Sequence, residues 1–352
     1  DERQQLREYC RLGDIAATTD LFHTFPKQLA LRRDMGRQYG LDLRSKSDAQ
    51  IAEAVMRKIL PFKVEKPPIA FGQRFMYRPP EWLAFQHLTV LDLLARSPFT
   101  IADSGSPTMT EELAATRIQI GAGSYQMGSG GLHSTESEVL YDSDDTHVIV
   151  IADVASYYPS LILRTGIYPK QIGPEFATIY RGWYDRRLAA KAAGDKRVAD
   201  SLKTLLNGTF GKLGSPWSIF YAPSEMIQVT LTGQLALLML IERLELAGVQ
   251  VISANTDGIV LHVRRDMRET ANAIIHEWER VSGMVMEMED WKWLASRDVN
   301  SYMAEAADGS IKRKGEYADP LPGASGWPNP NRQVSIDAAA AYLRDGTPVR
   351  DT

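Results

Sequence analysis

The sequence predicts an α+β fold, in which an antiparallel or mixed sheet carries helices on one face. Residues 147–152 form a short, continuous apolar run of the kind that fills a buried strand, and two long helical stretches follow it. Farther along, residues 249–263 read as strand, turn and strand, with Asn255 and Gly258 in the turn, where tight hairpins favour them. A further helix completes the order strand, helices, hairpin, helix, which is typical of this layered architecture.

Composition limits the class of protein. A chain of 352 residues, 44% hydrophobic and 24% charged, is large enough to bury a core in two or three compact regions. The single cysteine, Cys10, excludes an intrachain disulfide, and no Cys/His cluster has zinc-site spacing. The longest apolar run, residues 235–241, is shorter than a membrane-spanning helix, and no charged-then-apolar leader opens the sequence. We therefore expect a cytoplasmic protein with no membrane partner.

The net charge of −4 argues weakly against a nucleic-acid partner, because small nucleic-acid-binding domains are usually basic. The positive residues are unevenly distributed, however. Seven Lys and Arg residues fall within residues 186–212, and Lys-Arg-Lys occupies 312–314. Because salt screens charges beyond about 8 Å, such local patches can outweigh a mildly acidic total.

The N-terminal third reads as helices followed by irregular structure. Apolar residues recur at helical spacing through residues 1–60. Residues 61–120 read as mixed structure, punctuated by proline pairs at 67–68 and 79–80. Five glycines between 121 and 134 predict loop or tight turn, and we expect a domain boundary near this segment.

The remaining residues supply the sheet and its helices. Helices are expected at 175–193, 196–212, 224–247 and 266–282. Beyond them, Asp308 and Gly309 are a turn signal, so residues 312–314 are expected on a strand that leaves a hairpin. These basic residues suit contacts with a nucleic-acid backbone, and a basic edge strand that blocks unwanted pairing is the alternative.

Two aspartates stand at the ends of predicted strands. Asp153 follows the apolar run, and Asp257 lies in the hairpin turn. If the strands are neighbours, both carboxylates emerge at one edge of the sheet and could hold divalent cations, which prefer oxygen ligands. Two Mg²⁺ ions held in this way can drive phosphoryl transfer. The alternative is a pair of ordinary turn aspartates.

Three segments around these residues resemble motifs of the family B DNA polymerases. Residues 153–160, Asp-Val-Ala-Ser-Tyr-Tyr-Pro-Ser, resemble the first palm motif, D-x-x-S-L-Y-P-S. Residues 203–211 resemble the fingers motif, K-x-x-x-N-S-x-Y-G, with Gly208 and Phe210 as departures, and residues 255–258 correspond to D-T-D-S. Partial matches are Tyr125 with Gly130 and Gly131, and residues 312–315. The sequences of these motifs are most similar to those of phage-encoded members.

The resemblance implies roles for individual residues. Asp153 and Asp257 would be catalytic and, with the Val154 carbonyl, would bind two Mg²⁺ ions, or Mn²⁺ in their place. Lys203 would donate a proton to pyrophosphate. The implied nucleotide-binding residues are Ser156, Tyr157, Tyr158, Arg187, Lys191, Lys203 and Asn207. The implied primer-template contacts are Tyr125, Gly130, Gly131, Thr256, Lys312 and Lys314.

Helical spacing supports the implied nucleotide site. Lys203 and Asn207 are four residues apart, as are Arg187 and Lys191, so each pair shares a helix face. Two antiparallel helices would direct these groups into one groove and orient a triphosphate. A solvated basic face is the alternative.

Tyr158 has the position of a residue that excludes ribonucleotides. The resemblance implies that its ring stands beside the bound sugar, where it would clash with a 2′-hydroxyl. A tyrosine of the core is the alternative.

The main departure is Asn255, which stands where the family usually has Asp. A neutral amide in place of a carboxylate leaves two matched carboxylates and predicts weaker metal binding. An inactive, DNA-binding palm is therefore the competing hypothesis. An RNA-synthesising or reverse-transcribing palm is disfavoured by Tyr158 and by the Lys203 and Asn207 helix.

The ends of the sequence suggest parts of larger domains. Tyr9 and Asp14 resemble the third exonuclease motif, Y-x-x-x-D, with one additional residue between them, which makes Asp14 an exonuclease remnant. The first two exonuclease motifs are missing, so proofreading is not expected. Residues 338–352 resemble the lead into a thumb that is itself missing.

The resemblance therefore divides the chain as follows: exonuclease-like helices 1–60, a connecting region 61–120, palm 121–172, fingers 173–212, palm 213–330 and the lead into the thumb 331–352. The predicted activity is template-directed addition of deoxynucleotides to a primer 3′-hydroxyl in DNA replication. The expected partners are primer-template DNA and deoxynucleoside triphosphates, with any processivity or priming protein left open.

Overall fold

The computed structural model describes residues 2–318 and 330–351, which fall into two compact units. The first unit contains Asp1–Lys63 and Tyr180–Thr209. The second contains Val64–Ile179, Phe210–Asp319 and Asn331–Thr352. Residues on both sides of the glycine-rich segment 121–134 belong to the second unit.

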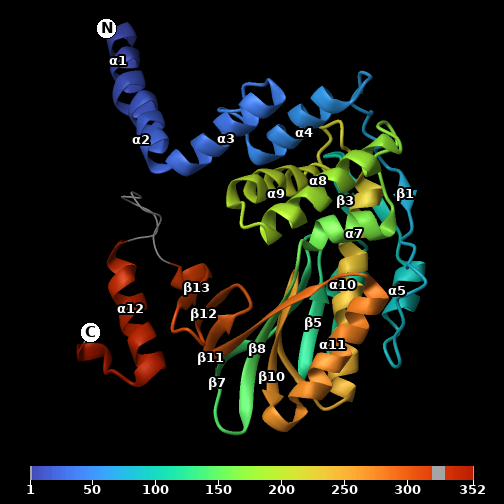
Figure 1. The fold of residues 1–352 in the computed structure, drawn as a ribbon, viewed down its shortest axis with the longest axis vertical. Helices are drawn as coiled ribbons and strands as arrows, with labels where there is room; N and C mark the ends of the chain where they lie inside the picture. Colours follow the sequence, from blue (N-terminus) through green and yellow to red (C-terminus); the bar gives the residue numbers. More distant parts are fainter. Residues whose placement is uncertain (1, 319–329, 352) are drawn as a thin grey trace. The chain divides into compact units, whose positions relative to one another are not determined.

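The second unit is built on a ten-stranded sheet in which the paired strands run antiparallel (Figure 1). Its order is β13-β12-β11-β8-β10-β9-β6-β5-β4, and β7 also pairs with β11. The strands are β4 Arg117–Ile120, β5 Gly123–Met127, β6 Leu132–Ser134, β7 Ser137–Asp142, β8 His147–Val154, β9 Gln250–Asn255, β10 Gly258–Arg264, β11 Met286–Asp298, β12 Ser301–Ala306 and β13 Ile311–Arg313.

Three helices cover one face of this sheet: α7 Tyr157–Thr165, α10 Pro223–Leu246 and α11 Arg268–Ser282 (Figure 1). The indole N–H of Trp278 on α11 donates to the Ala236 carbonyl of α10 at 2.7 Å. Helix α10 is long and apolar enough to cross a membrane, but 78% of its most apolar stretch is buried, as in the central helix of a core. The predicted α+β layering is therefore confirmed.

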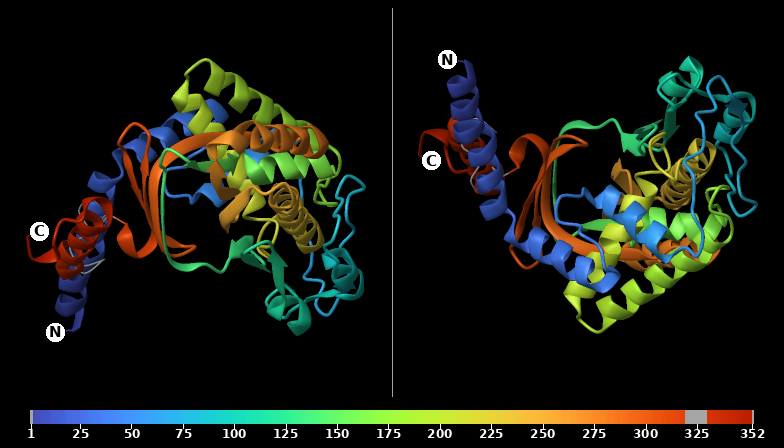
Figure 2. Two further views of the ribbon diagram at one scale, coloured as in Figure 1. Left: turned by 90° about the horizontal axis from the view of Figure 1, so that it is seen from below. Right: turned by 90° about the horizontal axis from the view of Figure 1, so that it is seen from above.

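The opposite face carries its own apolar layer. Ile149 and Ile151 of β8 pack there with Trp291 and Leu294 of β11. Since both faces of β8 are covered, its sequence is continuously apolar rather than alternating. Beside this layer, α12 (Pro330–Asp345) packs Ala340 against β11 and β12, and the strands and helix lie side by side in Figure 2.

A mixed segment, as predicted for residues 61–120, runs along α10. It contains α5 Val90–Arg96, α6 Glu111–Ala115 and a small sheet of β1 Arg74–Phe75, β2 Phe99–Ile101 and β3 Pro107–Thr108. Buried Glu242 on α10 accepts hydrogen bonds from the backbone N–H groups of Gln86, His87 and Leu88 at 2.8–3.0 Å. One carboxylate thereby fixes this irregular stretch to the core.

The first unit is helical, as predicted. Its elements are α1 Glu2–Tyr9, a π-helical segment Cys10–Ile15, α2 Ala16–Thr24, α3 Pro26–Tyr39, α4 Asp48–Ile59, and most of α8 Glu175–Ala192 and α9 Lys196–Phe210. Ser47 starts α4 with a capping box that includes Gln50. Helix α9 approaches α4 so closely that a Cβ on Gly208 would lie 2.6 Å from the Asp48 carbonyl.

The prediction that residues 121–134 form only loop or tight turn was wrong, because β5 and β6 lie within this segment. Gly121 makes a turn with φ of +56°, whereas Gly130 and Gly131 lie in the loop between the two strands. The side chains that hold the strands in the core are Tyr125, which lies between Gly121 and Gly130, and Leu132, which directly follows Gly131. The number of glycines therefore indicated the turns correctly but gave no indication of the strands.

Candidate functional site

The two aspartates meet at one edge of the sheet, as the sequence predicts. Strands β8 and β10 are antiparallel neighbours, and Asp153 pairs with Gly258. The backbone N–H of Val154 donates to the Asp257 carbonyl at 2.7 Å, which ties the hairpin turn to β8. Asp153 lies within β8 rather than after it, because pairing with β10 and β11 extends the strand to Val154.

Gly258 provides the space that the Asp153 carboxylate occupies. A Cβ on residue 258 would lie 1.9 Å from Oδ1 of Asp153. The carboxylate is therefore packed over the glycine backbone, next to Asp257. Any larger residue in this position would displace it.

A cavity of about 380 Å³ joins the carboxylates to the basic strand β13. Both aspartates line it, and so do Lys312 and Lys314, which follow the Asp308–Gly309 turn as predicted. Lys314 lies just beyond β13, with its Nζ 5.6 Å from the ring of Tyr302. The other polar lining residues are Ser253, Asn255, Thr256 and Ser296. Cations and carboxylates thus share one cavity.

The electrostatics of the cavity centre on Asp257. Its side chain reaches solvent, yet the protein surrounds it closely enough that burial raises the pKa of its carboxyl, and the negative charge of Asp153 raises it further. Lys314 and Lys312 oppose this increase. The two neighbouring carboxylates create a negative potential that a divalent cation would relieve.

Asn255 fixes the turn. Its Nδ2 donates to the Val299 carbonyl at 2.8 Å, and its Oδ1 accepts from the Thr256 hydroxyl at 3.1 Å. Thr256 itself has a left-handed backbone, with φ of +58°. Both ends of the amide therefore serve the loop, and Asn255 acts here as a positioning residue.

The donor set fits Mg²⁺, which binds through one or two carboxylates together with water and phosphate oxygens. Within residues 2–318 and 330–351, no group of three or more His, Cys, Asp or Glu side chains could hold a metal. Glu287 of β11 pairs directly with Asp153 and is a third acidic residue near the site that the sequence analysis missed. The alternation Met284-Val-Met-Glu-Met-Glu could have revealed it, since it predicts a strand with one acidic face.

Tyr158 stands in a fixed position beside the site. Its hydroxyl donates to the Gly130 carbonyl at 2.5 Å, and its ring stacks on Phe210 with centroids 3.6 Å apart. Burial, together with the charge of Asp257, raises the pKa of Tyr158 to about 12. The phenol therefore stays neutral and able to donate this bond.

Tyr157 is buried, in contrast to Tyr158. A Cβ on Gly233 of α10 would lie 2.3 Å from its hydroxyl oxygen, so the ring packs under α10 and cannot contact a nucleotide. The backbone N–H groups at the start of α7 remain available to bind a ligand. Ser156 has φ of +53° and precedes α7, so the amides of Tyr157 and Tyr158 lie in the first turn of that helix, where anions are favoured.

The loop that carries the predicted template contacts packs against the hairpin turn. The N–H of Thr256 donates to the Leu132 carbonyl at 2.8 Å, and a Cβ on Gly131 would lie 2.9 Å from Oγ1 of Thr256. Gly130 and Gly131 thus lie near the site. Tyr125, also implied as a primer-template contact, is only 1% exposed, so its ring belongs to the core.

The remaining predicted residues belong to the first unit. Lys203 and Asn207 are exposed and share one face of α9, while Lys191 is exposed and Arg187 half-buried on α8. The two helices pack together, and the Tyr180 hydroxyl donates to the Leu206 carbonyl at 3.0 Å. Asp14 is exposed in the π-helical segment.

Comparisons with known proteins support the fold. No family model and no curated protein matches the sequence. Among solved structures, the chain is similar to the family B DNA polymerase from the hyperthermophilic archaeon Pyrobaculum calidifontis, with a TM-score of 0.51 and 14% identity. The match covers 97% of this chain and 41% of that polymerase. The chain therefore has a fold similar to that of a family B DNA polymerase.

Proposed function

We propose that this chain is the palm and fingers portion of a template-directed DNA polymerase, which joins deoxynucleotides to a primer 3′-hydroxyl. The observation that carries the proposal is the cavity in which Asp153 and Asp257 face Lys312 and Lys314. Carboxylates suit metal-assisted phosphoryl transfer, and lysines suit the phosphates of a primer.

Two Mg²⁺ ions, or Mn²⁺, would activate the primer hydroxyl and neutralise the pyrophosphate when bound by Asp153, Asp257 and the Val154 carbonyl. The residues of the chain supply the positioning. Lys312 and Lys314 bind the primer backbone without reading its sequence, as a replicative enzyme requires.

Each unit carries part of the nucleotide-binding set that the sequence motifs imply. The amides of Tyr157 and Tyr158 at the start of α7 bind phosphate oxygens, with Ser156 setting the turn. Arg187, Lys191, Lys203 and Asn207 orient the triphosphate, and Lys203 donates a proton to the leaving pyrophosphate. Tyr158, fixed by Phe210 and Gly130, excludes the 2′-hydroxyl of a ribonucleotide.

The finer assignments rest on the sequence motifs. The motif sequences Asn-Thr-Asp-Gly and Lys-x-Lys-Gly support a phage-type family B DNA polymerase that acts in the host cytoplasm. Asp14 supports an exonuclease remnant in the first unit. Gly130, Gly131 and Thr256 support contacts with the template and primer, because they pack together beside the carboxylates.

A second candidate is a polymerase-like DNA-binding protein with a weakened site. Asn255 favours it, since its amide is used to hold the turn and brings no charge to the metals. Such a protein would bind primer-template with strong salt dependence but add no nucleotide.

Extension of a labelled primer-template tests both candidates. With Mg²⁺ or Mn²⁺, we expect template-dependent addition of deoxynucleotides that Asp257→Ala abolishes. The matched control is Asp103→Ala, which removes an exposed aspartate outside the cavity. Salt-sensitive DNA binding without any extension would favour the second candidate instead.

A further inference from the structure

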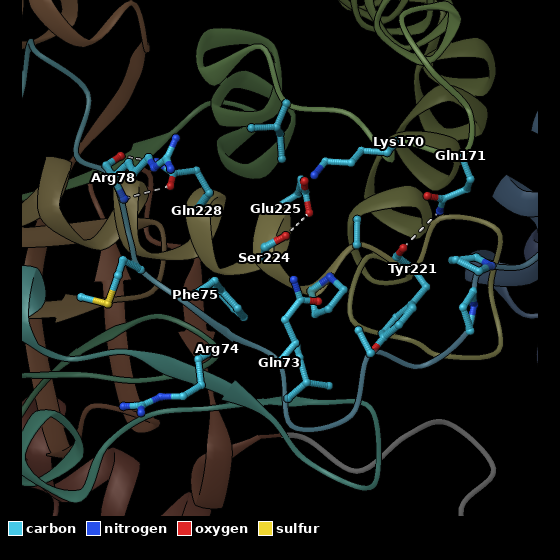
Figure 3. Close-up of a pocket in the computed structure, with 18 residues that line it drawn as sticks. Gln73, Arg74, Phe75, Arg78, Lys170, Gln171, Tyr221, Ser224, Glu225 and Gln228 are labelled. Carbon is cyan, nitrogen blue, oxygen red and sulfur yellow. Dashed lines mark hydrogen bonds between the residues drawn. The ribbon is translucent and has the colours of Figure 1, made fainter.

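The second unit contains a larger cavity, of about 760 Å³, for which the proposed chemistry has no use (Figure 3). Residues 67–78, which include β1 and lie on both sides of it, form one wall. Residues 167–171 and the beginning of α10 form the other. The two catalytic aspartates do not line it.

The cavity is positively charged. Arg74, Arg78 and Lys170 line it and are exposed. No ion pair involving these three side chains occurs among the described residues. Glu225 is the acidic side chain among the lining residues, and the Ser224 hydroxyl donates a hydrogen bond to it. The surplus of two positive charges predicts an anionic ligand.

An aromatic ring lies between these cations. Phe75 is half-buried and projects into the cavity, and its ring stacks on Phe99 with centroids 5.7 Å apart and planes 21° apart. A planar base placed on Phe75 would extend this stack. Near the same wall, Trp217 is 75% exposed, with the Lys66 ammonium 4.6 Å from its ring centroid.

Hydrogen bonds hold the walls in place. The Gln228 side chain bonds the backbone of Arg78 in both directions, donating to its carbonyl at 2.5 Å and accepting from its N–H at 3.2 Å. The Gln171 amide donates to the carbonyls of Ile219 and Tyr221. The cations are therefore carried by a fixed frame, which lowers the cost of ordering a ligand.

We propose that this cavity binds single-stranded nucleic acid, namely the unpaired template strand next to the primer-template duplex. Cations for phosphates and an aromatic platform for bases are the combination that binds single strands without sequence preference. A duplex offers no free base face to Phe75, and an acidic peptide would leave the ring unused. The identification of the strand as template rests on the proposed function; the affinity for single strands does not.

Fluorescence anisotropy with labelled oligothymidylate, without divalent cations or nucleotides, tests the site. Arg74→Ala/Arg78→Ala/Lys170→Ala should weaken binding at least tenfold and reduce the slope of log K against log salt by about 2. Phe75→Leu, which keeps an apolar side chain, should weaken binding several-fold without changing the salt slope. The control with the same charge change is Arg117→Ala/Arg264→Ala/Arg350→Ala, whose residues are exposed and do not line the cavity.

The same variants should bind a primer-template with a twelve-nucleotide 5′ overhang less tightly, and a blunt duplex as tightly as the unmodified chain. Equal weakening by the control triple variant would overturn the proposal, as would competition by poly-aspartate as effective as that by oligothymidylate. Primer extension with no effect of the overhang on affinity would refute this site while leaving the polymerase intact. Oligothymidylate binding that depends on these residues in a chain unable to extend primers would refute the polymerase and retain the site. Unchanged circular dichroism spectra would show that each variant is folded.

Discussion

The rings of Tyr158 and Phe210 lie nearly parallel, 10° apart, with their centroids separated by 3.6 Å. Tyr158 is the second residue of α7 and lies within residues 153–160, the segment that resembles the first palm motif, whereas Phe210 ends α9. The stack therefore links two of the three motifs within the second unit. Because the Tyr158 hydroxyl is also bonded to Gly130, the ring is restrained at its face and at its tip.

This restraint predicts how ribonucleotides are discriminated. Tyr158→Val should raise ribonucleotide incorporation about 100-fold relative to deoxynucleotides, because the wall beside the sugar is lost. Phe210→Ala should have a smaller effect in the same direction, since the ring remains but loses its support. Single-nucleotide insertion kinetics give the ratio of kcat/KM values. Tyr158→Phe keeps the wall and should keep the discrimination; loss of discrimination in this variant would contradict the steric explanation.

Gly258→Ala should impair the site without unfolding the protein. The new Cβ would overlap Oδ1 of Asp153, so the carboxylate must rotate away from the metal position. We expect nucleotide addition to fall at least tenfold while the melting temperature changes little. Gly182→Ala is the matched control, because its Cβ would meet nothing within 4 Å. Full activity in Gly258→Ala would show that the Asp153 orientation is not required.

Asp257→Asn should stabilise the metal-free protein. The pKa of Asp257 is raised in the folded state, so the folded protein holds this proton more tightly than the unfolded chain does. The destabilisation is therefore fully present above the raised pKa and is relieved as the pH falls through it. We expect a gain of about 1–3 °C in melting temperature at neutral pH, which disappears at acidic pH.

Mg²⁺ should reverse the order of the two melting temperatures, so that the unmodified chain becomes more stable than Asp257→Asn. Binding to the folded state raises the melting temperature of the unmodified chain, whereas Asp257→Asn should respond far less. Calorimetry with and without Mg²⁺ measures both effects. An equal response of the two proteins would place the metal elsewhere.

Lys314→Gln should shift the pH dependence of catalysis. Lys314 lowers the pKa of Asp257, so removing Lys314 raises that pKa further. Asp257 then stays protonated, and unable to bind metal, up to a higher pH. The acid limb of the kcat/KM profile should move upward, with activity near pH 9 less affected. Lys292→Gln, in an exposed ion pair with Glu305, is the control and should leave the limb in place.

Glu242→Ala should destabilise the second unit. It removes the acceptor of three backbone N–H groups that are partly buried, at a cost of about 3 kcal/mol in the free energy of unfolding. Denaturant unfolding measures this loss, and hydrogen exchange should accelerate at residues 86–88. Glu277→Ala, in an exposed ion pair with Arg280, should change stability by less than about 0.5 kcal/mol.

Local patterns were sufficient for the layered fold and for much of the site. The apolar run before Asp153 predicted a buried strand and the Asn-Thr-Asp-Gly turn predicted a hairpin, because hydrophobic period and turn residues are local properties of the sequence. The pairing of that strand with the hairpin was seen only in the tertiary structure. The Asp308–Gly309 turn similarly placed the basic strand. Where a local signal was ambiguous the sequence misled: the glycines of residues 121–134 indicated turns, but the segment also contains β5 and β6, and β6 pairs with the distant strand β9.

What the sequence determined by itself was the set of chemical groups and their local geometry: two carboxylates at strand ends, a lysine-rich strand, and a tyrosine beside a proline. The tertiary structure decided which of these groups meet. It buried Tyr125 and Tyr157, stacked Tyr158 on Phe210 and brought Lys314 to Asp257. It also aligned Glu287 with Asp153 and formed the basic cavity around Phe75. The physical reason is that burial and cross-strand register depend on contacts between residues far apart in the chain, which no local pattern contains.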